Sequence, residues 1–226
     1  MNRSPYFVSD VMSCPVVAVD QDAPFKEIVE TMARWKISAL PVLDEEHRVV
    51  GVVSAADLLP KEEFRGSVPT RLEQMHRLTD LAKAASTTAG QLMTRPAITV
   101  PGEAPLAHAA RKMAVDRVKR LPVVDAAGRL HGVVSRSDLL KVFLRPDDDL
   151  AAEVRRDVVQ RLFPGERVDV RVHGGVVTLS GSPADTRLVP LAGSLVRAVA
   201  GVVDVVWDRS GGNETAGEGT STAEAS

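Results

Sequence analysis

The chain contains an internal repeat, and this repeat constrains its fold more than any other feature of the sequence. The segment "GVVSAADLL" at Gly51 returns 81 residues later as "GVVSRSDLL" at Gly132. Two further pairs of segments keep the same offset, "VMSCPVVAV" with "LMTRPAITV" and "ALPVLDEEHRVVGVVS" with "RLPVVDAAGRLHGVVS". Since separated blocks share one register without an insertion, we interpret them as two copies of one structural unit.

Each copy predicts the element order β-α-β-β-α. A short β-branched run and a turn with Pro precede a segment with helical spacing, which in the first copy includes Phe25, Ile28 and Met32. Two strand-like runs joined by a polar turn follow, and a second helix begins directly after Ser54 or Ser135. A unit of about 50 residues covers its sheet poorly alone. We therefore expect the two copies to pack together.

The composition excludes several classes of protein. Hydrophobic residues make up 44% and charged residues 26% of the chain, and the net charge of -2 gives no reason to expect a nucleic acid partner. The single cysteine, Cys14, excludes an internal disulfide, and no His or Cys spacing predicts a metal site. We find no membrane-spanning run and no apolar leader, so we expect a cytoplasmic location. No nucleophile motif or glycine-rich phosphate loop occurs, so we expect no catalytic residues and no enzyme activity.

The repeated S-x-x-D motif has two interpretations. It places Ser54 with Asp57, and Ser135 with Asp138, at the start of a helix that follows a strand. A carboxylate there suits a ribose diol, while the hydroxyl and the free N–H groups of the first turn suit a phosphate. The same spacing is typical of a helix cap with Ser as the N-cap residue. Its occurrence in two copies favours a ligand, and both interpretations can hold for one Ser.

A family resemblance rests on three ordered motifs that occur twice between Val8 and Arg145. The patterns M-[ST]-x-x-P, h-P-V-h-D and G-h-h-S-x-x-D-L, with h for an apolar residue, resemble a tandem of cystathionine-β-synthase (CBS) domains. The resemblance implies an α+β fold with two β-α-β-β-α repeats, residues 8–65 and 89–145, packed as a pseudo-twofold pair. It also implies a regulatory module that binds AMP, ADP, ATP or S-adenosylmethionine, needs no obligatory cofactor and forms a homodimer.

The resemblance assigns two ligand sites, because the Asp of one repeat faces the first and second strands of the other. Site A consists of Ser54, Asp57, Thr94, Thr99, Val118, Lys119 and Arg120. Site B consists of Ser13, Ala18, Ile37, Ser38, Ser135, Arg136, Ser137 and Asp138. Site A has Lys119 and Arg120 where site B has Ser38 and Ala39, so Arg136 is the main candidate cation of site B. We expect a phosphorylated adenosine at site A and a weaker or empty site B.

The linker of residues 66–88 predicts a helix. Its residues Leu72, Met75, Leu78 and Leu81 recur at helical spacing, and we expect this helix to begin after Pro69.

The C-terminal part, residues 147–209, predicts the order α-β-β-α-β. The first helix begins at the acidic run 147–149, a hairpin turns at 173–175, and Pro190 predicts a break near Leu188. The segments "GGVVTLSG" and "AVAGVVDVVWD" resemble the BON domain, which implies contacts with a phospholipid surface or a protein. We expect Trp207 in the core and disorder in residues 210–226.

Two functions follow from this organisation. In the first, the chain is a non-catalytic sensor in which an adenine nucleotide contacts both repeats, and the BON domain passes the bound state to an unknown protein partner or surface. In the alternative, the BON domain binds a phospholipid or envelope surface and the CBS pair is a dimerising scaffold.

Overall fold

The computed structural model describes residues 6–65 and 78–208. They form two compact units that divide between Leu139 and Leu140. The predicted helix start after Pro69 and the predicted disorder of residues 210–226 lie outside the described residues. No described helix combines the length and hydropathy that crossing a bilayer requires.

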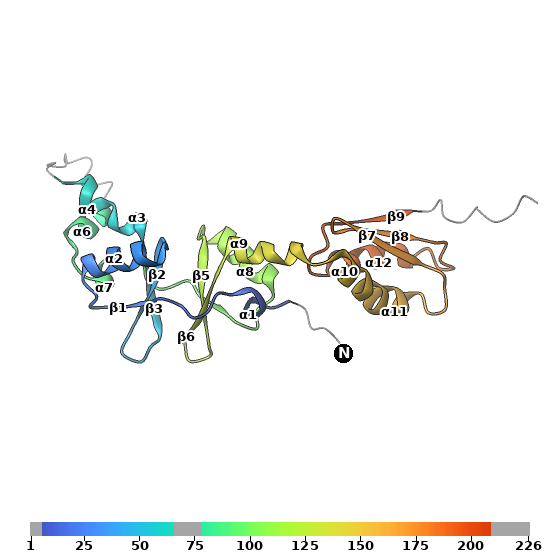
Figure 1. Cartoon of the computed structure of the whole chain (residues 1–226), viewed down its shortest axis with the longest axis horizontal. Coiled ribbons are helices and arrows are strands. Elements are labelled where there is room, and N and C mark those ends of the chain that lie inside the picture. The colour runs from blue at the N-terminus through green and yellow to red at the C-terminus, as the bar shows by residue number, and fades with distance from the viewer. Residues whose placement is uncertain (1–5, 66–77, 209–226) are drawn as a thin grey trace, which may run out of the picture. The chain divides into compact units, whose positions relative to one another are not determined.

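The first repeat is a three-stranded sheet with helices. Its elements are α1 (Val8–Val11), β1 (Val19–Asp20), α2 (Phe25–Trp35), β2 (Ala39–Leu43), β3 (Val49–Ser54), α3 (Ala55–Leu58) and α4 (Pro60–Glu63). The strand order is β1-β2-β3, with β1 parallel and β3 antiparallel to β2 (Figure 1). The helix α6 (Leu78–Ala85) follows in the linker.

The second repeat has the same architecture. Its elements are α7 (Ala89–Leu92), β4 (Val100–Pro101), α8 (Leu106–Val115), β5 (Arg120–Val124), β6 (Leu130–Ser135) and α9 (Arg136–Leu140). Its strand order is β4-β5-β6 with the same directions. Even the left-handed residues after the long helices correspond, Lys36 with φ 52° and Arg117 with φ 55°. The predicted β-α-β-β-α order of both copies is confirmed.

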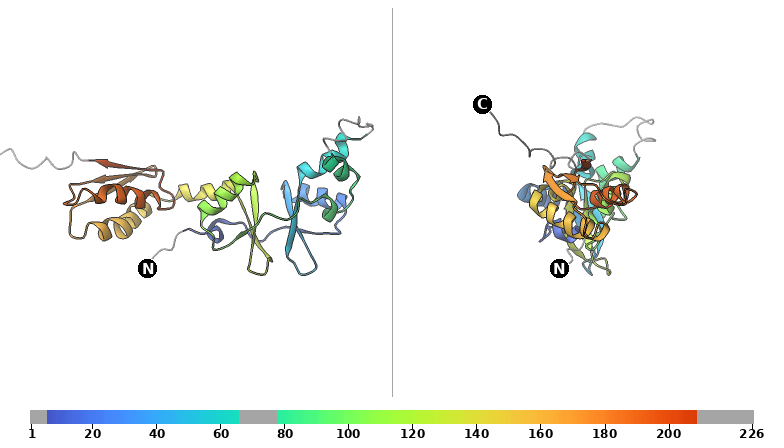
Figure 2. Two further views of the ribbon diagram at one scale, coloured as in Figure 1. Left: turned by 180° about the vertical axis from the view of Figure 1, so that it is seen from behind. Right: turned by 90° about the vertical axis from the view of Figure 1, so that its right-hand side faces the viewer.

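Backbone bridges between the repeats obey a twofold relation. Ser13 pairs with Val133, and their counterparts in the other copy, Thr94 and Val52, pair in the same antiparallel way. The hairpins β2–β3 and β5–β6 lie side by side in both views (Figures 1 and 2). Because each bridge becomes the other when the repeats are exchanged, the pair has the pseudo-twofold arrangement that the resemblance implied.

The repeats exchange their leading helices. Val8 of α1 donates its backbone N–H to Ala104 at 2.9 Å, and its side chain lies in the hydrophobic core of the second repeat. Ala89 of α7 donates in the same way to Ala23 at 2.9 Å, and Leu92 lies in the core of the first repeat. Each repeat therefore completes its core with a helix that precedes the other repeat in the sequence.

The hairpin turns are held by a carboxylate. Asp125 accepts hydrogen bonds from the backbone of Ala127 at 2.8 Å and of Arg129 at 2.9 Å, and from the Arg129 Nε at 3.0 Å. The backbone bond from Arg129 is the main reason why the pKa of Asp125 lies below its ordinary value. Asp44 and Arg48 make the corresponding contacts in the first repeat.

The C-terminal unit packs helices on one face of a three-stranded sheet. Its elements are η1 (Lys141–Leu144), α10 (Asp147–Val154), the π-helical turn η2 (Arg155–Val159), α11 (Gln160–Leu162), β7 (Asp169–His173), β8 (Val176–Ser180), α12 (Leu188–Arg197) and β9 (Asp204–Asp208). The strand order is β7-β8-β9, and α10, α11 and α12 lie on the same side of the sheet (Figure 2). Phe163 and Val177 are buried between the layers. The predicted α-β-β-α-β order is confirmed.

Two details of this unit follow from its sequence. Gly174 and Gly175 both have positive φ, which a two-residue hairpin turn requires, and Asp147 accepts their N–H groups at 2.7 and 2.9 Å. The helix α12 begins at Leu188, so Pro190 lies in its first turn, where a missing N–H breaks no helical hydrogen bond. The sequence predicted a kink or a break near Leu188, and the structure shows an uninterrupted helix that begins at this residue.

Candidate ligand-binding site

The S-x-x-D motif forms a helix cap in both repeats. Asp57 Oδ2 accepts hydrogen bonds from the Ser54 backbone N–H at 2.7 Å and from the Ser54 hydroxyl at 2.6 Å. Asp138 Oδ2 accepts the same bonds from Ser135 at 2.9 and 2.6 Å. Both aspartates are buried. These capping bonds are made to one oxygen of each carboxylate, so the Ser–Asp pair acts as a helix cap in both repeats.

At site A, Asp57 has a cationic partner that the sequence did not predict. Lys83 on α6 donates from Nζ to Asp57 Oδ1, and Thr94 Oγ1 donates to the same oxygen at 3.4 Å. The side chains of Lys83 and Asp57 are only 16% and 11% exposed. Lys61 also donates from Nζ to the backbone oxygen of Ala84 at 2.9 Å. The linker helix α6 is therefore fastened at site A by the carboxylate that we predicted to bind a ligand.

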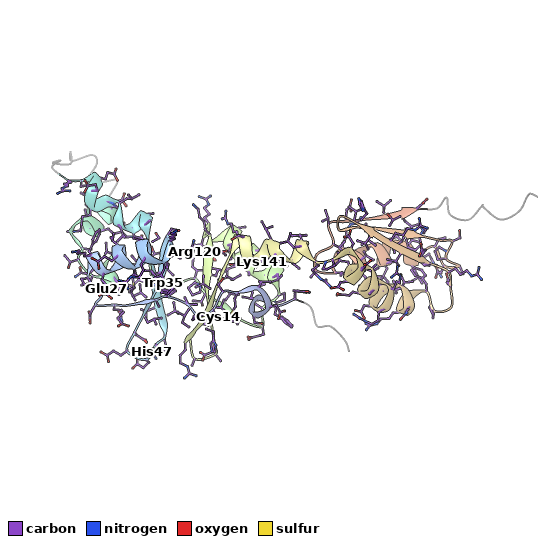
Figure 3. The ribbon with its side chains drawn as sticks, viewed as in Figure 1. Cys14, Glu27, Trp35, His47, Arg120 and Lys141 are labelled. Atoms are coloured by element: carbon purple, nitrogen blue, oxygen red, sulfur yellow. The ribbon has the colours of Figure 1, made fainter. Side chains whose placement is uncertain are left out.

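A cavity of about 600 Å³ lies at site B, between the two repeats. Of the residues predicted for this site, Ser13, Ile37, Ser135 and Asp138 line it. Its other lining residues are Pro15, Val16, Val17, Trp35, Ala39, Pro41, Arg120 and Val133. Figure 3 labels Trp35 and Arg120, which come from different repeats. The cavity thus has apolar walls with a few polar groups, which is typical of small-molecule sites.

The structure places two arginines the other way round from our prediction. Arg120, assigned to site A, lines the cavity at site B and donates from Nη2 to Ser38 Oγ at 3.3 Å. Arg136, assigned to site B, donates from Nη2 to the Val118 backbone oxygen, a site A position, at 3.1 Å. The reason is the strand register, since Arg120 on β5 is directly opposite Ser135 on β6. Site B therefore contains the guanidinium of Arg120, which the sequence analysis had assigned to site A.

The remaining predicted residues lie outside the lining of the cavity. The Ser137 hydroxyl lies 2.8 Å from that of Ser135, which does line the cavity. Thr99 and Ala18 are half-buried beside β4 and β1, and Lys119 is exposed. Within residues 6–65 and 78–208, no cluster of three or more His, Cys, Asp or Glu is arranged to hold a metal ion.

Comparison with known proteins decides the family. Residues 8–61 and 89–145 match the model of the CBS domain, and residues 146–208 match that of the BON domain. The chain belongs to the CBS-domain family. Its two repeats are a CBS pair, and its C-terminal unit contains a BON domain.

Relatives resemble this chain mainly over the CBS pair. An uncharacterized protein of Methanocaldococcus jannaschii is 28% identical over 160 residues, which cover 64% of this chain and 95% of that protein. The chloroplastic CBS domain-containing protein CBSX2 of Arabidopsis thaliana is 31% identical over 130 residues, 53% of this chain, and the match spans 55% of CBSX2. The crystal structure of CBSX2 in complex with AMP has a TM-score of 0.54 and 31% identity, and the match covers 62% of this chain and 97% of that one.

Proposed function

We propose that this chain is a non-catalytic regulatory protein that binds an adenosyl nucleotide, of the AMP, ADP, ATP or S-adenosylmethionine class, in the cavity at site B. One observation carries the proposal: Ser135, Asp138 and Arg120 line a single cavity of about 600 Å³ with apolar walls. This volume lies within the range of about 300–1,000 Å³ that is typical of small-molecule sites. The complex of the relative CBSX2 with AMP supports the ligand class.

The chemistry of the lining fits the parts of a nucleotide. The Asp138 carboxylate accepts hydrogen bonds, which suits the two hydroxyl groups of a ribose. The Arg120 guanidinium has several N–H donors in a planar fork and suits a phosphate. The valine and isoleucine side chains provide the apolar surface that a purine needs. Each part of an adenosyl nucleotide therefore has a suitable partner within one cavity.

Site B is a better candidate than site A, which reverses the order that the cation count favoured. At site A, the Asp57 carboxylate is already engaged by the Lys83 ammonium and the Thr94 hydroxyl. A ligand that uses Asp57 must displace these groups or share the carboxylate with them. We therefore propose site B as the principal site and site A as secondary.

Isothermal titration calorimetry tests this proposal. The full chain is titrated with AMP, ADP, ATP and S-adenosylmethionine, and so are the variant Asp138→Asn and its matched control Asp57→Asn. Loss of a hydrogen bond to a charged group weakens binding by about tenfold or more, so we expect that loss for Asp138→Asn and little change for Asp57→Asn. Loss only in Asp57→Asn would move the principal site to site A. No binding by the wild-type chain would refute the function.

We also propose that the ligand acts by bridging the repeats. The cavity is lined by both CBS repeats, so a bound ligand favours the arrangement in which they meet. Transfer of this state through the BON domain, homodimerisation through the CBS pair and a cytoplasmic location stay predictions. The alternative, binding of a phospholipid surface by the BON domain, is tested by liposome flotation of the chain with and without residues 147–226.

A further inference from the structure

The two tryptophans of the chain have different surroundings, because Trp35 lies at the cavity and Trp207 packs against the core of the C-terminal unit. It is the last residue of α2, and its side chain lines the cavity at site B while the residue remains 58% exposed. Among the described residues, its indole N–H has no hydrogen-bond partner. The other tryptophan, Trp207, donates its indole N–H to the Gly181 backbone oxygen at 3.2 Å and packs edge-on against Phe163, with ring centroids 5.8 Å apart. One tryptophan belongs to a core, and the other presents its ring at a cavity.

The two repeats contribute different groups to the cavity. Arg120, Ser135 and Asp138 come from the second repeat together with Val133, whereas Trp35 comes from the first repeat together with Ser13, Val17 and further apolar residues. Of the described lining residues, Trp35 is the one with an aromatic ring. A ligand with a flat apolar part and a charged sugar phosphate part is therefore oriented with its flat part toward the first repeat.

We propose that Trp35 is the stacking surface for the purine base of the ligand in this cavity and so determines its specificity for a nucleoside. This inference rests on the proposed function and adds the residue that recognises the base. An exposed indole gains favourable contact when a base covers it, and every base offers a ring face for stacking. Arg120 and Asp138 then contact the phosphate and the ribose from the opposite repeat.

The stacking surface is present in one half of the molecule only. The 81-residue offset places Asp116 at the position that corresponds to Trp35, directly after α8. A carboxylate offers no ring face, and its charge repels a phosphate. Trp35 therefore distinguishes site B from site A independently of the contact between Lys83 and Asp57.

Tryptophan fluorescence tests the stacking directly. The substitution Trp207→Phe leaves Trp35 as the only tryptophan of the full chain, since the chain contains two tryptophans. We expect AMP to change the Trp35 emission with the same midpoint as calorimetry, and ribose 5-phosphate, which has no base, to leave the emission unchanged. Because loss of a stacking partner costs about 5- to 150-fold in affinity, Trp35→Ala should weaken AMP binding by that factor. Trp35→Phe keeps a flat ring and should stay within about threefold of the wild type.

The results separate this inference from the proposed function. If calorimetry shows that the wild type binds AMP but Trp35→Ala binds it equally well and the emission does not respond, the function stands and the stacking role is wrong. If Trp35→Ala instead lowers the oligomeric mass by sedimentation without affecting AMP affinity, Trp35 contacts another copy of the chain, and the proposal is overturned. If the wild type binds no adenosyl compound, the function fails and the inference fails with it.

Discussion

Replacement of Lys83 should destabilise the CBS pair, because Lys83 neutralises a buried carboxylate. The change Lys83→Met keeps an unbranched apolar side chain of similar length and removes the ammonium that contacts Asp57. Removal of one partner from a buried ion pair costs about 3–5 kcal/mol. Here Asp57 keeps its bonds from Ser54 and Thr94, and both members of the pair remain slightly exposed. We therefore expect the free energy of unfolding to fall by about 2 kcal/mol.

Urea unfolding followed by far-UV circular dichroism measures this loss. In a Trp35→Phe background, Trp207 is the only tryptophan of the chain, and its fluorescence reports the C-terminal unit separately, where no change is expected. The control is Lys26→Met. The Lys26 side chain is 89% exposed and its Nζ lies 3.7 Å from Glu30 Oε1, so this change should lower the free energy of unfolding by at most about 0.5 kcal/mol. The double variant with Asp57→Asn should be more stable than the sum of the single losses predicts. Equal losses for Lys83→Met and Lys26→Met, or strict additivity in the double variant, would refute the reasoning.

Two further predictions concern polar contacts at turns. A carboxyl-carbon NMR titration should give Asp125 a pKa below its ordinary value of 3.8. The contribution of Asp125 to the free energy of unfolding is therefore fully present above pH 3.8, and it is lost as the pH falls through the folded-state pKa. Arg129→Gln should move that pKa part of the way back up, because the backbone bond remains; an unchanged value would contradict the assigned contacts. Asp147→Ala removes the acceptor of the Gly174 and Gly175 N–H groups and should destabilise the C-terminal unit by about 1–2 kcal/mol in urea unfolding. A loss below about 0.3 kcal/mol would show that water replaces the carboxylate.

The architecture of the repeats was predictable, because the local patterns and their period agree. Strand and helix positions follow from apolar spacing, and the common offset extends to individual backbone conformations such as those of Lys36 and Arg117. The core in which α1 packs was not predictable in the same way. Val8 and Val11 have the same apolar spacing whichever core they join, and only the packed structure selects the second repeat.

The sequence predicted the Ser–Asp motif of the site, but it did not predict which side chains from other elements would lie beside that motif. Ser135 and Asp138 lie close in sequence, and a helix start fixes their geometry. Arg120 and Trp35 reach the cavity from different elements, so their presence there depends on strand register and helix ending. Lys83 lies 26 residues from Asp57, and its contact depends on how the linker helix packs. The parts of the site that the sequence did not predict are therefore contacts made by long side chains from distant positions in the chain.

The exchange of α1 and α7 has a consequence for fragments of this chain. A cut in the linker between residues 65 and 78 leaves two half-chains, each of which carries a helix that its own core does not use and lacks the helix that it needs. The CBS repeat of each half should remain largely unfolded when the halves are expressed apart and should regain structure when they are mixed, whereas the C-terminal unit keeps its own core. The covalent linker thus raises the effective concentration of two mutually dependent repeats, and within residues 6–139 the smallest autonomous folding unit is the whole CBS pair.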